Sequence, residues 1–448
     1  MLRVTLAQAE PGMELAMPVY HPHRTSVVLL RAGARLDEHT LKRLREMPVG
    51  ELWIQFPPLD HLRRMISPEL LVSCGEMTRR VAATIDQLAE KPHAHLDYYT
   101  VRQAVVLVIE ALAGSPLSGQ FMTDLAMSRA PAVRHACNVC LTSVLMGLKL
   151  DFHLVHERAR LGGAQAKDVT PLGVGAMLHD IGMTQLDTAT LARWDEHADE
   201  RDEAWRRHVQ VGFEMVQGDF DPASAGVVLH HHQGFDGSGF PSRTEFSGEV
   251  HTPEGSEIHV FARICAAADM LDRLRFPEYG MGPAAHVSPR MSKVGALARM
   301  LRSSLRDRFD PYVLMALVNV SPPFSPGMVV MVESRGKKER RRGVVTNWSV
   351  ESPCRPSVAI LGGADGSSWW DDEKAEVVEL SKTPELSIVE AEGFDVRGDL
   401  FEPIEAGEFD IVRAARQMMN AAPEITPSDE TAVDKPSGEK PGDSREAA

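Results

Sequence analysis

The chain lacks the features of a secreted or membrane-spanning protein. Its five cysteines in 448 residues are an odd number, which fits reduced thiols better than a disulfide framework. The most apolar helical stretch, VRQAVVLVIEALAG, is interrupted by Arg102, Gln103 and Glu110 and is too short to span a bilayer. No basic segment precedes an apolar run at the N-terminus, so no signal peptide is expected. These absences predict a cytoplasmic protein that does not enter a membrane.

Positive charge is also scarce. The formal net charge of −15 argues against general binding to DNA, RNA or anionic membranes. An anionic substrate would therefore need local positive charge, supplied by metals or by a few arginines. The basic run GKKERRRG (336–343) lies between two expected strands, and we interpret it as a solvated hairpin tip rather than a nucleic-acid contact.

Thiol chemistry has little support in the pattern. Cys137 and Cys140 form a lone CxxC inside a helical stretch, without a second pair that would complete a zinc site. Packing of these side chains inside a helical core is the better interpretation.

The periodicity of apolar residues predicts a mainly α protein with small β-rich modules at both ends. No internal repeat is evident. The expected parts are a β-rich or α+β module at 1–65, a helical connector at 66–118, a helical domain at 119–320, a β-rich module at 321–400, and a helix followed by a disordered acidic tail at 401–448.

The helical domain contains histidines and aspartates on several separate helices: His135, His179, Asp180, His208, His231, His232 and Asp269. A single histidine on an amphipathic helix usually has a packing role. Asp269, however, follows an alanine run and precedes Met270 and Leu271, and a buried carboxylate without a partner is very costly. Asp180 stands in a similarly apolar stretch, so metal cations that neutralise both acids are a plausible explanation.

Imidazoles mixed with carboxylates suit Fe, Mn, Zn or Ni rather than Mg or Ca alone. Five histidines and two aspartates exceed the ligands of one tetrahedral centre, so we expect two metals with Asp180 as the bridging carboxylate. Such a pair can activate a hydroxide as nucleophile and stabilise a pentavalent phosphorus.

The order of these motifs resembles the HD-GYP family of HD-domain metal-dependent phosphohydrolases. GAMLHDIG resembles the family's apolar run into HDIGK, HHQGFDGSGFP (231–241) resembles HHExxDGxGYP, and ARICAAADMLD resembles the final helix with its metal-binding aspartate. The resemblance covers roughly residues 119–320 and implies an all-helical HD-type domain. The flanking β segments are similar to regions that often accompany this domain.

The resemblance implies a bacterial signalling enzyme that hydrolyses cyclic di-GMP to pGpG or GMP with two iron or manganese ions. The implied ligands are the seven residues named above, with His179 and Asp180 at the catalytic centre. It also implies that the turn residues Asp236, Gly237, Gly239, Phe240 and Pro241 lie on the substrate side. His230 is then an additional ring outside the ligand set.

The chain departs from the family pattern at positions near the substrate. Met183 replaces the lysine after HDIG, Gln233 replaces the glutamate after the tandem histidines, and Phe240 replaces the tyrosine of GYP. Pro131 stands where three-metal members carry a glutamate, which argues against a third metal. The family's RPY motif has no counterpart in DRLRFPEYGMG, where Arg273 or Arg275 could substitute for it.

These departures leave two alternatives beside the phosphodiesterase. One is a catalytically degenerate signalling module that binds nucleotide or a partner protein, through the GFP turn or the β modules. The other is an HD phosphohydrolase with a different phosphoester substrate. The input signal, the metal's identity and the oligomeric state are not specified by the sequence.

Overall fold

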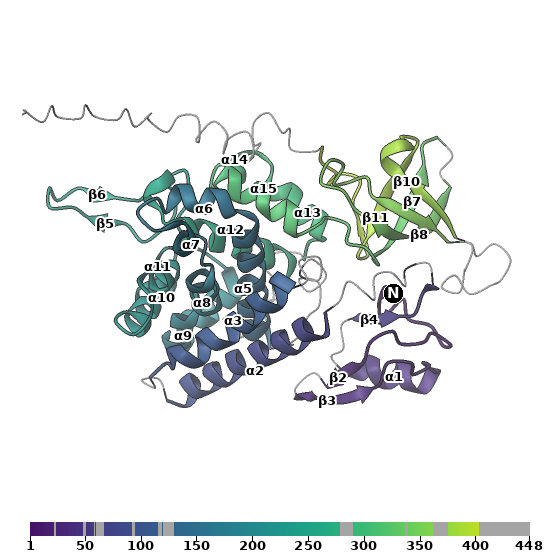
Figure 1. The fold of residues 1–448 in the computed structure, drawn as a ribbon, viewed down its shortest axis with the longest axis horizontal. Helices are drawn as coiled ribbons and strands as arrows, with labels where there is room; N and C mark the ends of the chain where they lie inside the picture. Colours follow the sequence, from purple (N-terminus) through teal and green to yellow (C-terminus); the bar gives the residue numbers. More distant parts are fainter. Residues whose placement is uncertain are drawn as a thin grey trace, which may run out of the picture. The chain divides into compact units, whose positions relative to one another are not determined.

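A computed structural model describes residues 1–21, 24–47, 51–57, 59, 67–91, 95–114, 119, 130–277, 290–336, 339–361 and 375–402 (Figure 1). The expected helix and acidic tail at 401–448 lie outside the described residues except for 401 and 402. The last part of DRLRFPEYGMG, from residue 278, also lies outside them.

Two long helices, α2 (Pro68–Glu90) and α3 (Tyr98–Gly114), lie side by side at the positions expected for the helical connector (Figure 1). α2 begins where its sequence specifies a start, because the Ser67 hydroxyl accepts a hydrogen bond from the Leu70 N–H at 3.1 Å and Pro68 occupies the first turn.

The helical region from residue 131 is built around α5, α8, α11 and α12, which pack on one another. Its elements are α5 (Pro131–Lys149), α6 (Asp151–Glu157), α7 (Gly163–Ala166), α8 (Thr170–Leu178), η2 (Ile181–Gln185), α9 (Thr188–His197), α10 (Glu203–Val216), α11 (Pro222–His230), η3 (Gly255–Glu257), α12 (Val260–Arg275), α13 (Lys293–Met300), α14 (Ser303–Arg306) and α15 (Pro311–Val320). α5 and α12 are buried around most of their circumference, which explains their apolar composition and lack of a clear polar face.

Glycines allow two of these helical segments to approach closely. A Cβ on Gly182 of η2 would lie 2.0 Å from the backbone oxygen of His208, and one on Gly212 would lie 2.9 Å from Val228. The missing side chains therefore bring η2 against α10, next to the histidine that α10 carries.

The N-terminal region is an α+β arrangement. It contains β1 (Leu2–Thr5), β2 (Val19–His21), β3 (Arg24–Leu30), α1 (Glu38–Glu46) and β4 (Glu51–Ile54), with β1 antiparallel to β4 and β2 antiparallel to β3. The C-terminal region is a six-stranded antiparallel sheet in the order β10-β9-β8-β7-β11-β12. Its strands are β7 (Val329–Ser334), β8 (Arg340–Asn347), β9 (Ser357–Ile360), β10 (Glu376–Glu379), β11 (Leu386–Ala391) and β12 (Phe394–Asp395), with η4 (Leu380–Lys382) between β10 and β11.

The N-terminal region and the C-terminal sheet share one hydrophobic core. Val329, Val344 and Leu361 of the C-terminal region pack in the same buried cluster as Leu2, Leu52 and other apolar side chains of residues 1–59. The Arg3 N–H also donates to the Gly327 carbonyl at 2.8 Å. The two ends of the chain, which the sequence suggested as separate modules, are thus packed together.

Two further expectations need correction. Residues 119–320 are not entirely helical where described, because β5 (Arg243–Thr244) and β6 (Val250–His251) form an antiparallel hairpin after the GFP turn. The basic run 336–343 is not simply a hairpin tip: Arg340, Arg341 and Arg342 belong to β8, where Arg340 pairs with Glu333 of β7 at 3.0 Å, while 337 and 338 lie outside the described residues.

Apolar helices are accounted for by burial within the fold. No single described helix is long and apolar enough to cross a membrane, although α5 and α6 meet that criterion together across an 86° bend.

All five cysteines are buried free thiols, and Cys140 lies 3.3 Å from the Gly173 carbonyl at the contact between α5 and α8. The CxxC therefore packs helices, as its context indicated.

Candidate metal centre

The seven candidate ligands come from five places in the fold and meet in one region. His135 lies in the first turns of α5, His179 and Asp180 directly follow α8, and His208 lies within α10. His231 and His232 directly follow α11, and Asp269 lies within α12. Their potential ligand atoms form two groups, each with all atoms within 4.8 Å of one another: Asp180, His208, His231 and His232; and His135, His179 and Asp269.

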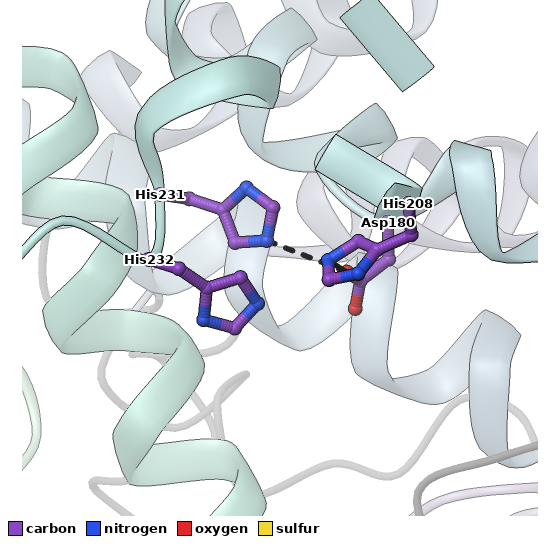
Figure 2. A group of neighbouring side chains, drawn as sticks. All are labelled: Asp180, His208, His231 and His232. Carbon is purple, nitrogen blue, oxygen red and sulfur yellow. Dashed lines mark ion pairs between the residues drawn. The ribbon is translucent and has the colours of Figure 1, made fainter. Parts of the chain in front are cut away.

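Asp180 lies between the two groups. Its Oδ1 is 3.3 Å from His208 Nε2 and 3.4 Å from His231 Nε2, whereas its Oδ2 is 3.1 Å from His179 Nε2. Figure 2 shows the rings of His208 and His231 directed at this carboxylate, with His232 beside His231. One carboxylate therefore presents one oxygen to each group, as a bridging ligand must.

Three of the histidine rings are oriented by the backbone one helical turn earlier. The Nδ1 atoms of His179, His208 and His231 lie 2.8, 2.7 and 2.9 Å from the carbonyl oxygens of Ala176, Trp205 and Val228. Because a carbonyl can only accept a hydrogen bond, each Nδ1 must carry the proton. In the neutral form of such a ring, the lone pair is on the Nε2 that faces Asp180, which is the tautomer that a metal-binding histidine needs.

His135 is oriented by a carboxylate instead. Its Nδ1 lies 2.8 Å from Asp272 Oδ2, and the Asn138 side-chain amide donates to the other Asp272 oxygen at 2.7 Å. Its Nε2 lies 3.1 Å from both His179 Nε2 and Asp269 Oδ1. Asp272 was not among the predicted site residues. It stands in the same apolar helix as Asp269, so the cost of burying a carboxylate could have identified both.

Charges inside the group shift several protonation equilibria. Burial alone would raise the pKa of Asp180, but His179, His208 and His231 together lower it well below its usual value. Burial alone would lower the pKa of His135, but Asp269 and Asp272 raise it to about 9. Burial and the neighbouring histidines lower the pKa values of His231 and His232. Asp180 is therefore anionic, and His231 and His232 are neutral, near pH 7.

The neutral rings of His231 and His232 fit metal binding. The Nε2 atoms of His208, His231 and His232 are buried and form no hydrogen bond within the described part of the chain. Imidazole nitrogens aimed at a carboxylate are a donor set for divalent transition metals. A buried nitrogen that forms no hydrogen bond is costly unless a metal ion binds it. His230 belongs to neither group, in keeping with the expectation that it is the additional ring.

The turn after the tandem histidines packs directly against them. The Phe240 ring stacks on His232 with ring centres 4.7 Å apart and also contacts Trp205. Gly239 has a φ of +102°, and a Cβ there would lie 2.1 Å from the His232 carbonyl oxygen, so only glycine fits. Asp236 is exposed and accepts a hydrogen bond from the Ser238 N–H at 3.0 Å, which closes the turn where Gly237 also has positive φ. Pro241 follows Phe240 through a cis peptide bond.

The substituted positions make apolar or internal contacts. Met183 is buried with Trp194, Trp205, Val209 and Phe240. The Gln233 amide donates to the Pro241 carbonyl at 2.6 Å and so holds the base of the turn. Pro131 begins α5. None of these three supplies a cation or an extra carboxylate to the site.

A cavity opens beside the two groups of candidate metal ligands. It contains about 630 Å³ of empty space, including the part open to solvent, and is lined by His135, Asp180, Met183 and apolar residues of α2, α5 and α8. The Asp180 side chain is 16% exposed, whereas the side chains of His135 and His208 are almost fully buried. The Asp180 carboxylate thus faces the cavity.

The two candidate arginines have separate environments. Arg273, one turn after Asp269 on α12, lies 3.5 Å from Asp269 and 2.9 Å from Glu200. Arg275 lies 3.1 Å from Glu392, in the turn between β11 and β12, and its guanidinium lies over the Phe276 ring. Only Arg273 is beside the metal groups.

Comparisons with known proteins agree with this arrangement. A family described as the HD domain matches residues 145–313. The chain is 27% identical over 364 residues to the cyclic di-GMP phosphodiesterase PA4108 of Pseudomonas aeruginosa, covering 75% of this chain and 79% of that protein. It is 30% identical over 115 residues to the cyclic di-GMP phosphodiesterase response regulator RpfG of Xanthomonas campestris, covering 25% of this chain and 28% of that protein.

Among solved structures, Bd1817, described as an HDG"Y"P protein from Bdellovibrio bacteriovorus, is similar with a TM-score of 0.37 at 13% identity, over 71% of this chain and 98% of that one. The HD-domain match, the two phosphodiesterase relatives and the ordered motifs from His135 to Asp269 agree on one assignment. The chain carries an HD domain over residues 145–313, and its motifs are similar to those of the HD-GYP family.

Proposed function

We propose that this chain is a metal-dependent phosphodiesterase that hydrolyses cyclic di-GMP to pGpG, GMP or both. The observation that carries the proposal is Asp180, whose two oxygens face two groups of histidine nitrogens at 3.1 to 3.4 Å. The names of the two curated relatives support the choice of substrate.

In this proposal His208, His231 and His232 hold one metal, His135, His179 and Asp269 hold the other, and Asp180 bridges both. Two divalent ions, Fe or Mn first and Zn or Ni next, would lower the pKa of a water molecule and polarise the phosphodiester.

The protein's own residues position these groups. The carbonyl contacts of His179, His208 and His231 fix which nitrogen faces the centre, and Asp272 does the same for His135. Phe240, stacked on His232, covers one side of the group, while the cavity next to Asp180 admits the substrate. Burial of the site excludes bulk water, which strengthens every electrostatic interaction within it.

Met183 and Gln233 are the specific observations that favour a second candidate, a module that binds nucleotide or a partner without turnover. Met183 packs against tryptophans and Gln233 binds Pro241, so neither replaces the charged side chain of the family pattern. An HD phosphohydrolase that acts on another phosphoester is the third reading of the same departures.

The test is to measure metal content and turnover on one preparation. Protein purified anaerobically is analysed for Fe, Mn, Zn and Ni, then incubated with cyclic di-GMP, and pGpG and GMP are resolved by chromatography. We expect two metals per chain and product formation that is lost in Asp180→Ala, with the fold verified by circular dichroism.

A matched pair of histidine variants provides the control. His231→Ala should lose metal and activity, whereas His230→Ala, one residue earlier and outside both groups, should retain both. Two metals without product would point to a binding module or another phosphoester, and the absence of metal would contradict both enzymatic candidates.

A further inference from the structure

An arginine cluster lies on the α12 side of the metal groups, outside the family pattern. Arg273 Nη1 contacts Glu200 Oε1 at 2.9 Å and Asp269 Oδ2 at 3.5 Å. Arg308 Nη1 lies 3.7 Å from the other Glu200 oxygen. One carboxylate, on the loop between α9 and α10, is therefore held between two guanidinium groups beside a candidate metal ligand.

Both arginines are fixed to the parts that form the site. The Arg273 guanidinium lies over the Trp194 ring, 5.3 Å from its centre, and Trp194 stacks on Trp205 next to His208 and His232. The backbone carbonyl of Arg308 accepts a hydrogen bond from the Phe235 N–H at 2.9 Å, within the glycine-rich turn. The cluster thus lies between the metal groups and the turn that the sequence assigns to the substrate side.

The cluster is partly exposed to solvent, mainly at Glu200 and Arg308. The side chains of Arg273, Glu200 and Arg308 are 15%, 28% and 27% exposed, whereas Asp269 is only 4% exposed. A dissolved anion can therefore reach the guanidinium groups, and Glu200 occupies the position that such an anion would take.

An anionic substrate needs positive charge near the candidate metal ligands, and the arginine cluster can supply it. Methionine stands at 183 where the family has a lysine, and the described part of α12 contains no RPY motif, so the usual cations are missing. A phosphodiester still needs a charge-assisted partner, and the planar fork of arginine matches phosphate oxygens well.

We propose that Arg273 and Arg308 form the phosphate-binding site of this chain, and that Glu200 occupies it as an internal carboxylate until an anionic ligand displaces it. The inference rests on the proposed function for the identity of the substrate, cyclic di-GMP, and on the geometry alone for the anion site.

The experiment compares four variants with the wild-type chain: Arg273→Ala, Arg308→Ala, Glu200→Gln and the control Arg201→Ala. Arg201 is the neighbour of Glu200 in the same loop, but it is 86% exposed and pairs with Asp199. Calorimetry measures binding of inorganic phosphate and of cyclic di-GMP to chelator-treated protein, and steady-state kinetics on metal-loaded protein give KM and kcat.

We expect each arginine-to-alanine variant to weaken binding of both anions at least tenfold, with KM rising more than kcat falls. Binding should become less dependent on salt in both variants, because one cation is lost. Glu200→Gln should bind both anions several times more tightly, since a neutral amide competes less for the guanidinium groups. Arg201→Ala should behave as wild type.

Separate outcomes decide the two proposals. A wild-type chain that binds phosphate but leaves cyclic di-GMP intact overturns the proposed function and leaves the anion site supported. Unchanged phosphate affinity in Arg308→Ala and Glu200→Gln overturns the anion site, whether or not cyclic di-GMP is hydrolysed. Arg308 does not contact Asp269 in any recorded ion pair, so its variant remains informative if Arg273→Ala folds poorly.

Discussion

At the scale of single residues, the site depends on groups that orient the candidate ligands. At His135 the group that orients the ring is the buried carboxylate of Asp272. Asp272 is therefore a positioning residue whose effect should appear in metal binding before it appears in the fold.

Replacing Asp272 with asparagine keeps its size and removes its charge. Since partners that orient metal ligands typically contribute a factor of about 10–100 in metal affinity, we expect a loss of that order. Competition with a chromogenic chelator measures it. Asn138→Ala, which removes only the amide that holds Asp272, should give a smaller loss, and equal affinities in all three proteins would contradict the assigned role.

Gly239 in the glycine-rich turn and Gly248 in the β5–β6 hairpin both have positive φ, and they allow a sharper comparison. Alanine at Gly239 would meet both an unfavourable φ of +102° and the His232 carbonyl 2.1 Å away, whereas alanine at Gly248 meets only a φ of +86° with open space around it. We expect Gly248→Ala to cost about 1 kcal/mol of unfolding free energy. Gly239→Ala should cost several times more and should lower metal content, because it displaces the backbone of His232. Similar urea midpoints for the two variants would contradict this reading.

At the scale of secondary-structure elements, the N-terminus of α12 contains a titratable cap. His259 Nδ1 accepts a hydrogen bond from the Phe261 N–H at 3.2 Å. Burial, and then the charges of Arg158 and Arg263, lower the pKa of His259 to about 4. The helix that carries Asp269 and Arg273 therefore begins at a histidine that is neutral in the folded protein near pH 7.

This histidine should make the protein acid-sensitive in a defined window. In the unfolded chain it binds a proton near pH 6.5, but the folded chain resists protonation until about pH 4. The unfolding free energy should thus fall as pH decreases from about 6.5 to 4, by up to about 3 kcal/mol from this group. His259→Asn retains a capping acceptor and should lose this part of the pH dependence in urea titrations. An unchanged slope would show that other groups cause it.

The candidate metal ligands could be predicted from the sequence, whereas the charged residues around them could not. The order from His135 to Asp269 predicted which residues would meet, because ligand chemistry limits the residue types and the motifs resemble those of the HD-GYP family. Glu200 and Arg308 were missed because they stand in polar loops, where charged residues are common and carry no signal. The sequence offered Arg273 and Arg275 equally as substrate-side residues. Only the fold separates them, because Arg273 pairs with Glu200 and Arg275 pairs with Glu392.

At the scale of the whole molecule, Glu392 connects three regions of the chain. Its carboxylate lies 3.2 Å from Arg3 in β1 and 3.1 Å from Arg275 at the end of α12, and it accepts the Lys293 N–H at the start of α13 at 2.7 Å. The side chains of Arg3, Arg275 and Glu392 are 5%, 6% and 8% exposed. Such contacts between distant segments are invisible to local periodicity, so the sequence did not predict them.

Removing Glu392 should destabilise the molecule more than removing a surface acid. Breaking a buried ion pair costs about 3–5 kcal/mol, so we expect Glu392→Ala to lose several kcal/mol of unfolding free energy. Glu333 also pairs with two arginines, Arg340 and Arg397, but at the surface, where a pair contributes about 0–1 kcal/mol. Urea unfolding of Glu392→Ala and Glu333→Ala compares them, and equal losses would contradict a role for Glu392 in holding the regions together.

The core shared by the two ends of the chain has a consequence for biosynthesis. Residues 1–59 leave the ribosome first, yet Val329, Val344 and Leu361, which help to cover them, are made about 300 residues later. At roughly 5–20 residues per second, the apolar faces of β1 and β4 wait about 15–60 s for those partners. Nascent chains should therefore be good clients for chaperones that shield exposed strands, and messages truncated after the helical region should yield protein that aggregates through its N-terminus.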